Sequence, residues 1–293
     1  MAPIQVTHFT DPGCPWAYSA APALATLQWR YGDQLQWRMV MIGLVESAQQ
    51  YLDRGYTPER MADHARFERY GMPLGAPVKR RVAATSRACR AIVASRLSEP
   101  ACETAVFRAI QFAQFTTGLV IDDDEDLATA LADVPGIDAA AIVGAIDSPE
   151  VIEAYERDRA EARTAAGSPT AAQGKAAQTD GPVRYTAPSL IFTTEDGRTL
   201  EAGGFQPVEA YDVCLANLDP TLARRAPATE GELPAMFDLF PDGLTTAEVA
   251  ALMTGGNDAP DVPAARSALI SSGVIGKPVS DDAIWGALAR ATA

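Results

Sequence analysis

One cysteine stands where a thiol can act as a nucleophile. The motif Cys14-Pro15-Trp16-Ala17 follows a turn at the end of an apolar run, and Pro is favoured in the first turn of a helix. A thiol at a helix start lies beside unpaired amide N–H groups and the positive end of the helix dipole. Both favour the nucleophilic thiolate, so we expect Cys14 to be exposed and reactive. The alternative is a small buried cysteine.

The remaining cysteines and the histidines offer little further chemistry. Cys89, Cys102 and Cys214 fall on apolar helix faces and are predicted to belong to the core. Only two histidines occur, of which we expect His8 in a strand and His64 at the surface. No zinc-binding spacing is present, and the sequence predicts no metal site.

The first elements of the chain place Cys14 at the start of a helix. Residues 4–9 are β-branched and aromatic, which predicts a strand, and Asp11-Pro12-Gly13 breaks it. A helix over residues 15–31 and a second strand over residues 35–42 follow. A strand-helix-strand unit this short predicts a parallel pair with a right-handed crossover.

The middle of the chain changes from helices to a hairpin. Apolar residues recur at helical spacing between residues 45 and 165, and we expect a long loop over 165–182. Residues 189–194 and 199–202 predict two strands joined by a turn. A helix over residues 207–218 follows.

The C-terminal part predicts a linker and a small helical unit. After the linker at 219–240, caps and prolines predict helices at 247–253, from Pro263 and from Ser280. The pattern is typical of a short helix-turn-helix or winged unit. From residue 241 onward there are three basic and six acidic side chains, which disfavours DNA binding, so we expect a packing or lid module.

Together these features resemble the DsbA-like thioredoxin-fold family. The resemblance is carried by the Cys-Pro-Trp-X-Tyr motif and by Thr186-Ala187-Pro188-Ser189 before the hairpin. It is to the cytosolic branch that includes FrnE-like proteins, with kappa-class glutathione transferases and 2-hydroxychromene-2-carboxylate isomerases as more distant relatives. It covers roughly residues 4–218 and implies an α/β thioredoxin-like fold with an inserted all-helical domain and a C-terminal helical extension.

The same resemblance implies how the chain is divided and which residues form the site. In that family the first motif cysteine is the nucleophile and the proline before the third strand is cis, which implies these roles for Cys14 and Pro188. The implied parts are the first thioredoxin-like segment, the helical insertion with its loop, the second thioredoxin-like segment, and the linker with the extension: residues 1–44, 45–180, 181–218 and 219–293. The residues expected to line the substrate groove are Pro15, Trp16, Ala17, Tyr18, Thr186, Ala187 and Pro188.

Ala17 departs from the family pattern. A resolving cysteine commonly occupies this position, and without it a mixed disulfide on Cys14 cannot be closed by its neighbour. We expect a monothiol oxidoreductase resolved by an external thiol such as glutathione or mycothiol. The alternatives are an isomerase or transferase that uses a thiol cofactor, although those isomerases carry Ser where this chain has Cys14, and a non-catalytic binding protein.

Charge restricts the partners. The formal net charge of −14 argues against nucleic acid or an anionic membrane as the main partner, and no apolar run approaches a membrane span. Residues 60–96 nevertheless hold nine basic and two acidic side chains. This stretch is either a solvated helix face or a rim that collects an anionic thiol beside Cys14. In the second interpretation Arg80, Arg87 and Arg90, which share a helix face, bind the anion.

Few cysteines and no recognisable signal peptide predict a cytoplasmic protein. We expect no tightly bound cofactor, a small thiol or a disulfide-bearing substrate as partner, and leave a homodimer open.

Overall fold

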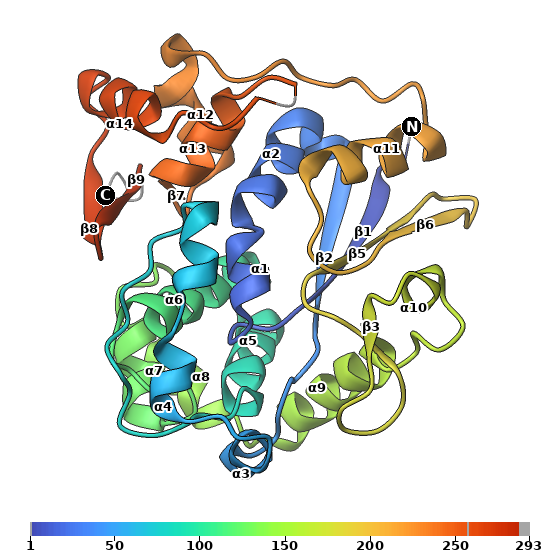
Figure 1. Cartoon of the computed structure of the whole chain (residues 1–293), viewed down its shortest axis with the longest axis vertical. Helices are drawn as coiled ribbons and strands as arrows, with labels where there is room; N and C mark the ends of the chain where they lie inside the picture. The colour runs from blue at the N-terminus through green and yellow to red at the C-terminus, as the bar shows by residue number, and fades with distance from the viewer. Residues whose placement is uncertain (1, 257, 287–293) are drawn as a thin grey trace.

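A mixed four-stranded sheet forms the centre of the thioredoxin-like part. The computed structural model describes residues 2–256 and 258–286 (Figure 1). The first two strands pair in parallel, and both later pairings are antiparallel. In spatial order the strands are β2 (Leu35–Met41), β1 (Ile4–Thr10), β5 (Ser189–Thr193) and β6 (Thr199–Ala202).

The helix that follows β1 is divided into two. The sequence predicts one helix over residues 15–31, but the structure has α1 (Pro15–Ser19) and α2 (Ala21–Tyr31). Pro22 explains the break, because it cannot donate the backbone hydrogen bond that would join the two helices. The crossover from β1 through these helices to β2 is otherwise as predicted.

Alternate residues of the strands face two different layers. On one face Val6 and Phe192 pack against Leu27 of α2 and Tyr211 of α11 (Val208–Leu218). On the other face Phe9, Val40 and Ile42 pack with Ala162 near the end of α9 (Pro149–Ala162). This two-residue alternation is the pattern of a sheet that is covered on both sides.

The segment between β2 and β5 is mainly helical and has its own core. Its helices are α3 (Ala48–Asp53), α4 (Pro58–Ala62), η2 (Ala65–Tyr70), α5 (Ser86–Ser98), η3 (Pro100–Cys102), α6 (Glu103–Thr116), α7 (Asp124–Leu131), α8 (Ala139–Ala145) and α9. Ile92, Val106, Ile110, Leu127 and Tyr155 are buried together at their centre. No helix in the described part of the chain is both long enough and apolar enough to cross a bilayer.

The predicted long loop at 165–182 contains short regular elements, so that prediction is wrong in part. Ser168 caps α10 (Pro169–Ala172), and the buried Thr170 donates from its amide and its hydroxyl to the Glu201 carboxylate on β6. The short strand β3 (Ala176–Ala177) pairs with β4 (Arg184–Tyr185). These contacts hold the segment that leads into β5.

The C-terminal unit combines helices with a small sheet. Its strands pair in the order β7 (Leu244–Thr245), β9 (Asp282–Trp285) and β8 (Gly276–Val279). The predicted helix from Ser280 is therefore wrong. Ser280 has φ 50° and occupies the turn between β8 and β9, and the residues directly after this turn pair as a strand; the part of the predicted helix beyond residue 286 lies outside the described residues. The helical elements of the unit are η4 (Glu230–Glu232), α12 (Leu233–Leu239), α13 (Thr246–Met253) and α14 (Val262–Ser271).

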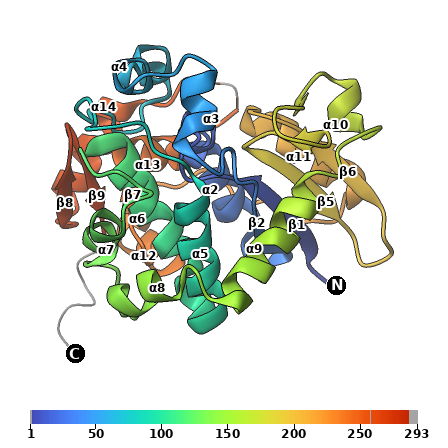
Figure 2. The same cartoon turned by 90° about the horizontal axis from the view of Figure 1, so that it is seen from below.

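This unit packs on the thioredoxin-like part through α2. Ala25 and Trp29 of α2 share one buried cluster with Val249, Leu252 and Leu269. Figures 1 and 2 show the unit beside α2 and α6, on the opposite side of the molecule from β6 and α10. The extension is thus an integral layer of the fold.

Candidate active site

Cys14 is fixed at the start of α1 by a tight turn. Its amide donates to the Asp11 carbonyl at 3.1 Å, and its own carbonyl accepts from the Tyr18 amide at 3.0 Å. Gly13 has no room for a side chain, because a Cβ there would lie 2.6 Å from Thr85 Cγ2. The sequence Asp-Pro-Gly therefore delivers the thiol to the helix start as predicted.

The thiol lies against the segment Thr186-Ala187-Pro188, which we call the proline loop. Cys14 Sγ donates to the Ala187 carbonyl at 3.2 Å, and the Ala187–Pro188 peptide bond is cis. Ser189 holds this loop in shape, since its hydroxyl donates to the Thr186 carbonyl at 2.6 Å and accepts from the Gly204 amide at 2.9 Å. Two segments 173 residues apart in the sequence meet at one sulfur atom.

Cys14 is buried, contrary to the expectation of an exposed thiolate. Only 7% of its surface is exposed, and burial raises the pKa of the thiol to about 11, with the Asp11 carboxylate acting in the same direction. Amide N–H groups of Ala17 and Trp16 and the Arg184 guanidinium oppose this rise in pKa. They do not cancel it, because burial of the thiol has the largest effect on its pKa.

Asp11 is a functional candidate that sequence reasoning treated only as a turn residue. Its carboxylate is fully buried and accepts from the Gly13 amide, the Leu44 amide and the Thr85 hydroxyl, each at 2.9 Å. Burial raises its pKa against these hydrogen bonds. The available signal was an acidic residue three positions before a candidate nucleophile.

No second cysteine takes the place of a resolving thiol beside Ala17. Cys89 is in the core as predicted and lies 3.5 Å from the Asp11 carboxylate, where burial raises the pKa of its thiol well above the usual range. Cys102 is half-buried rather than in the core, which corrects its predicted placement, whereas Cys214 is half-buried and packs against the core cluster of Tyr211 and Leu215. All four cysteines are free thiols.

Aromatic side chains form a wall next to the thiol. The Trp16 ring contacts the rings of Phe67, Tyr70 and Phe205, with centroids 4.9, 6.0 and 5.3 Å apart. The Arg66 guanidinium lies over both the Trp16 and Phe67 rings, and that of Arg69 over the Tyr70 ring. We call Trp16, Phe67, Tyr70 and Phe205 the aromatic wall.

Tyr18 does not line this groove. It is 1% exposed, its ring stacks on Phe115 at 4.6 Å, and its hydroxyl donates to the Pro73 carbonyl at 2.8 Å. The predicted groove position of Tyr18 is therefore wrong. Helical spacing turns Tyr18 toward the inserted helices, whereas Trp16 faces the proline loop side.

The structure pairs the predicted anion-binding arginines with carboxylates instead of bringing them to Cys14. Arg80 contacts Asp123 and Asp126, whereas Arg87 and Arg90 share Asp147. Of the two interpretations of the basic stretch, the solvated, ion-paired face is correct for these three residues. Arg80 precedes α5, so the prediction that it shares a helix face with Arg87 and Arg90 is wrong. The aspartates that pair with the three arginines lie between residues 123 and 147, and the spacing of the arginines does not reveal them.

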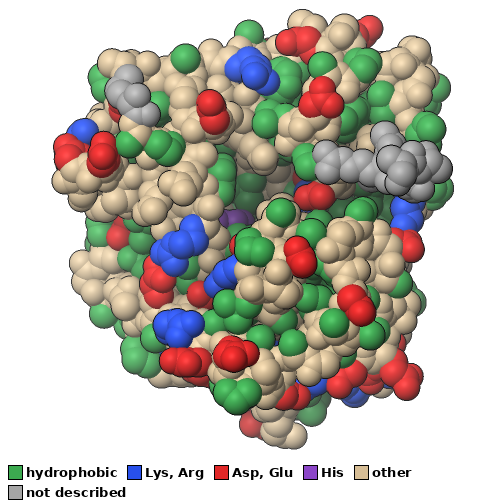
Figure 3. All heavy atoms as spheres, turned by 180° about the vertical axis from the view of Figure 1, so that it is seen from behind, with side chains coloured by type: hydrophobic (Ala, Val, Ile, Leu, Met, Phe, Trp, Pro, Cys, Tyr) green, Lys and Arg blue, Asp and Glu red, His purple; other side chains and the backbone are tan. Residues whose placement is uncertain are grey.

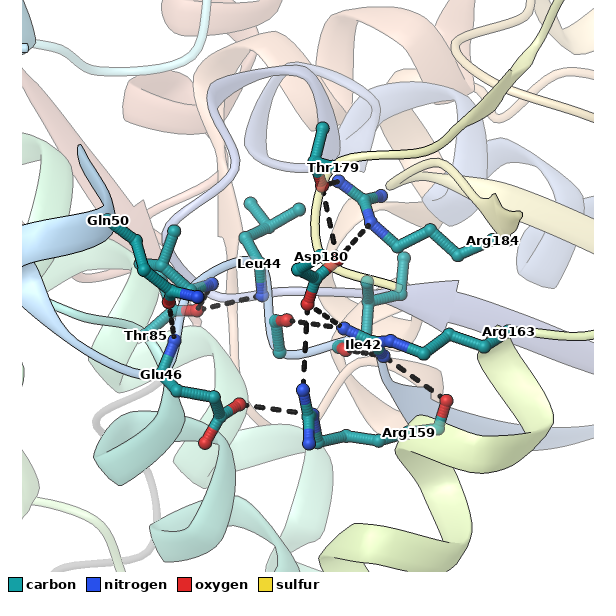
Figure 4. A network of polar contacts seen from close by, with 12 residues as sticks. Ile42, Leu44, Glu46, Gln50, Thr85, Arg159, Arg163, Thr179, Asp180 and Arg184 are labelled. Atoms are coloured by element: carbon teal, nitrogen blue, oxygen red, sulfur yellow. Dashed lines mark hydrogen bonds and ion pairs between the residues drawn. The ribbon is translucent and has the colours of Figure 1, made fainter. Parts of the chain in front are cut away.

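A second basic cluster holds the loops around the site (Figure 4). Arg163 donates to the carbonyls of Ile42 at 2.9 Å and Gly43 at 3.3 Å and pairs with Asp180, which Arg159 also contacts at 3.5 Å. Arg184 is buried beside the same aspartate, at 3.8 Å. The cluster joins α9 to the loop after β2 and to the segment before the cis proline.

The described residues contain no group of three His, Cys, Asp or Glu side chains that could hold a metal ion. His8 is buried in β1 against Trp37 and Phe107. His64 is half-buried beside the Phe115 ring, not fully at the surface as predicted.

Comparisons with known proteins agree with this geometry. The fold resembles a candidate protein disulfide isomerase from Nitrosomonas europaea, with 20% identity, a TM-score of 0.55, and coverage of 75% of this chain and 99% of that chain. It also resembles the cytosolic disulfide reductase DsbM from Pseudomonas aeruginosa, with 19% identity, a TM-score of 0.50, and coverage of 74% and 98%. No curated protein matches the sequence significantly. The family model described as "DSBA-like thioredoxin domain" matches residues 5–185, and the chain therefore belongs to that family.

Proposed function

We propose that the protein is a monothiol thiol-disulfide oxidoreductase with Cys14 as its nucleophile. The observation that carries this proposal is the contact of Cys14 Sγ with the Ala187 carbonyl beside the cis Pro188, at a helix start whose fourth motif position is Ala17. A thiol at a helix start and a cis-proline loop in contact with it support this role. An adjacent second thiol is not.

The reaction needs an external thiol to complete it. Cys14 loses its proton to solvent, and the thiolate attacks the small-thiol sulfur of a mixed disulfide on a substrate. A new S–S bond forms on Cys14, and the substrate leaves as a thiolate that takes up a proton. A second small thiol, as its thiolate, then attacks the adduct, which yields the small-thiol disulfide and restores Cys14. Overall, one free small thiol is consumed, the substrate thiol is released, and the disulfide bond passes from the substrate to the small-thiol disulfide.

Cations near Cys14 support a small anionic thiol, such as glutathione or mycothiol, as the external thiol. Arg66 and Arg69 take part in no ion pair among the described residues, and both are held over rings of the aromatic wall. Lys175 lies at the other border, where its carbonyl accepts from the Thr186 hydroxyl at 2.6 Å. In a chain of net charge −14, cations without a carboxylate partner beside the thiol favour a ligand that carries carboxylates.

A high thiol pKa supports a second candidate function. A Cys14 thiol that stays protonated at neutral pH would suit a protein that binds a ligand in the groove without covalent chemistry. An isomerase or transferase that only orients a thiol cofactor has no observation in its favour beyond the shared fold. The proposal also includes a cytoplasmic location, which four free thiols support because they persist in a reducing compartment, and a homodimer.

The test is turnover of a glutathionylated peptide with reduced glutathione as reductant. We expect the protein to catalyse release of the peptide thiol and Cys14→Ser to abolish this activity. Cys102→Ser and Cys214→Ser are matched controls, because both remove a half-buried thiol away from the groove, and they should retain activity. Equal rates for the parent and Cys14→Ser would reject the oxidoreductase and leave the binding protein.

A further inference from the structure

A pocket unrelated to the Cys14 sulfur lies between the sheet and the C-terminal unit. It has a volume of about 210 Å³ and is bordered by β1 and β2, by α1 and α2, by α6, and by residues 239–248 of the C-terminal unit. Figure 3 shows that this side of the molecule is hollowed near its middle, with a histidine side chain visible inside and hydrophobic side chains around it. Cys14 is not part of the lining.

Most of the lining is apolar, and small residues create the space. Ala17, Ala21 and Ala25 present methyl groups where longer side chains would fill the volume. Phe107 and Phe240 supply larger apolar surfaces on the opposite walls. Such a combination of an apolar body with few polar groups is typical of sites for small organic molecules.

The polar groups of the lining are short of partners. Within the described residues, His8 Nε2, Trp37 Nε1, Arg108 Nε and Gln111 Nε2 are buried without a hydrogen bond. The nitrogens of Trp37, Arg108 and Gln111 carry hydrogen and can only donate. Buried donors without an acceptor are rare in folded proteins, and here several belong to residues of a single pocket.

Charge in the pocket is already balanced. Arg108 makes a two-fold ion pair with Glu248, at 2.7 and 3.0 Å, and Glu248 is 1% exposed. His8 adds no charge at neutral pH, because burial lowers its pKa to about 4. An anionic ligand would therefore find Arg108 already paired, and a cationic ligand would find Glu248 already paired.

We propose that this pocket binds an uncharged, mainly apolar organic molecule that carries a carbonyl oxygen, held by its apolar body and by N–H groups of Gln111, Trp37 and Arg108. These nitrogens are inaccessible to solvent in the free protein, so binding requires a side-chain rotation that brings one of them to the ligand oxygen. The C-terminal unit supplies one wall, so the site exists only in a chain that has this extension. The proposal is independent of the reaction at Cys14.

Benzophenone is a suitable probe, because it is an uncharged diaryl ketone that also forms covalent adducts under light. Diphenylmethane is its matched control, since it has the same two rings and no carbonyl. We expect calorimetric titration of the full chain to give at least five-fold weaker binding for diphenylmethane. Light-induced adducts of benzophenone should map to α2, α6 or residues 239–248.

Two variants locate the site. Ala21→Leu should fill the pocket and abolish binding of both probes, whereas Ala160→Leu, which is exposed on α9, should bind like the parent. Gln111→Leu should reduce benzophenone affinity to that of diphenylmethane while leaving diphenylmethane binding unchanged, and it provides the test if Ala21→Leu does not fold. No binding, equal affinity for the two probes in the parent, adducts elsewhere, or unchanged benzophenone affinity in Gln111→Leu would overturn the proposal.

Discussion

The character of Cys14 is set by its surroundings rather than by its place in the motif. A helix start favours a thiolate, but burial and the nearby Asp11 carboxylate favour the thiol. The balance raises the pKa to about 11. In the free protein the Cys14 thiol is therefore held in its protonated form, and under the proposed function a substrate must compete with the Ala187 carbonyl for the sulfur.

Replacing the neighbouring carboxylate should make the thiol more reactive. Asp11→Asn removes a negative charge that opposes the thiolate, so the pKa of Cys14 should fall and alkylation at pH 8 should be faster by roughly tenfold per unit of pKa. In the parent, the rate should keep rising with pH above 9. The measurement is the rate of iodoacetamide labelling at Cys14 between pH 6 and 10, with folding checked by thermal unfolding. A slower reaction in Asp11→Asn would contradict this account.

The candidate site is formed by α1 and the proline loop. Each contains one of the two sequence motifs that carry the family resemblance. β1, β2 and the hairpin of β5 and β6 were predictable, because alternation and turn residues are local signals. The cis bond at Pro188 and its position beside Cys14 agree with what the family resemblance implied. Burial of the thiol could not be predicted, because it depends on Ala187, 173 residues away.

The element-level errors have the same origin. The orientation of Tyr18 depends on Phe115, and the pairing of Arg87 depends on Asp124 and Asp147. Helical spacing shows which residues share a face but not what that face meets. The hairpin of β8 and β9 was missed because its cap-like Ser280 also suits a turn.

Restoring a thiol in α1 should convert the protein to a dithiol enzyme. Ala17 is the fourth residue of the motif, and its amide approaches the Cys14 sulfur. Ala17→Cys, treated with oxidised glutathione, should first acquire glutathione on Cys14 and then release it as an internal disulfide forms. Intact mass and peptide mapping distinguish these species. A persistent adduct in Ala17→Cys would show that α1 does not bring the two sulfurs together.

The η2 segment should contribute to binding of the small thiol through its unpaired arginines. Arg66→Ala should raise the KM for reduced glutathione about fivefold, corresponding to roughly 1 kcal/mol for an exposed charge, and the effect should shrink at high salt. Arg87→Ala is the matched control, because this arginine is already paired with Asp124 and Asp147. Equal KM values for both variants would place the anion elsewhere.

At the scale of the whole molecule, His8 lies buried where the sheet packs on the inserted helices, in contact with Trp37 of β2 and Phe107 of α6. His8 is 5% exposed, and burial lowers its pKa from 6.5 to about 4. The unfolded chain takes up a proton at this group below pH 6.5 while the folded chain does not. Stability should therefore decrease as pH falls from 6.5 to 4, by up to about 3 kcal/mol from this group.

Denaturant unfolding at pH 7 and pH 5 measures this contribution. His8→Leu places an apolar side chain against Trp37 and Phe107 and removes the group that titrates. The loss of stability between the two pH values should be smaller in His8→Leu than in the parent. An identical loss in both proteins would assign the acid sensitivity to other groups.

The most direct test of the central claim is the fate of the parent protein in oxidised glutathione without added thiol. Intact mass and peptide mapping should show a single glutathione on Cys14, persisting after the excess reagent is removed, because Ala17 provides no thiol to displace it. Formation should accelerate with pH, as the pKa of about 11 requires. Modification of Cys102 or Cys214 with Cys14 left free, or an internal disulfide in place of the adduct, would contradict the assignment of Cys14 as a monothiol nucleophile.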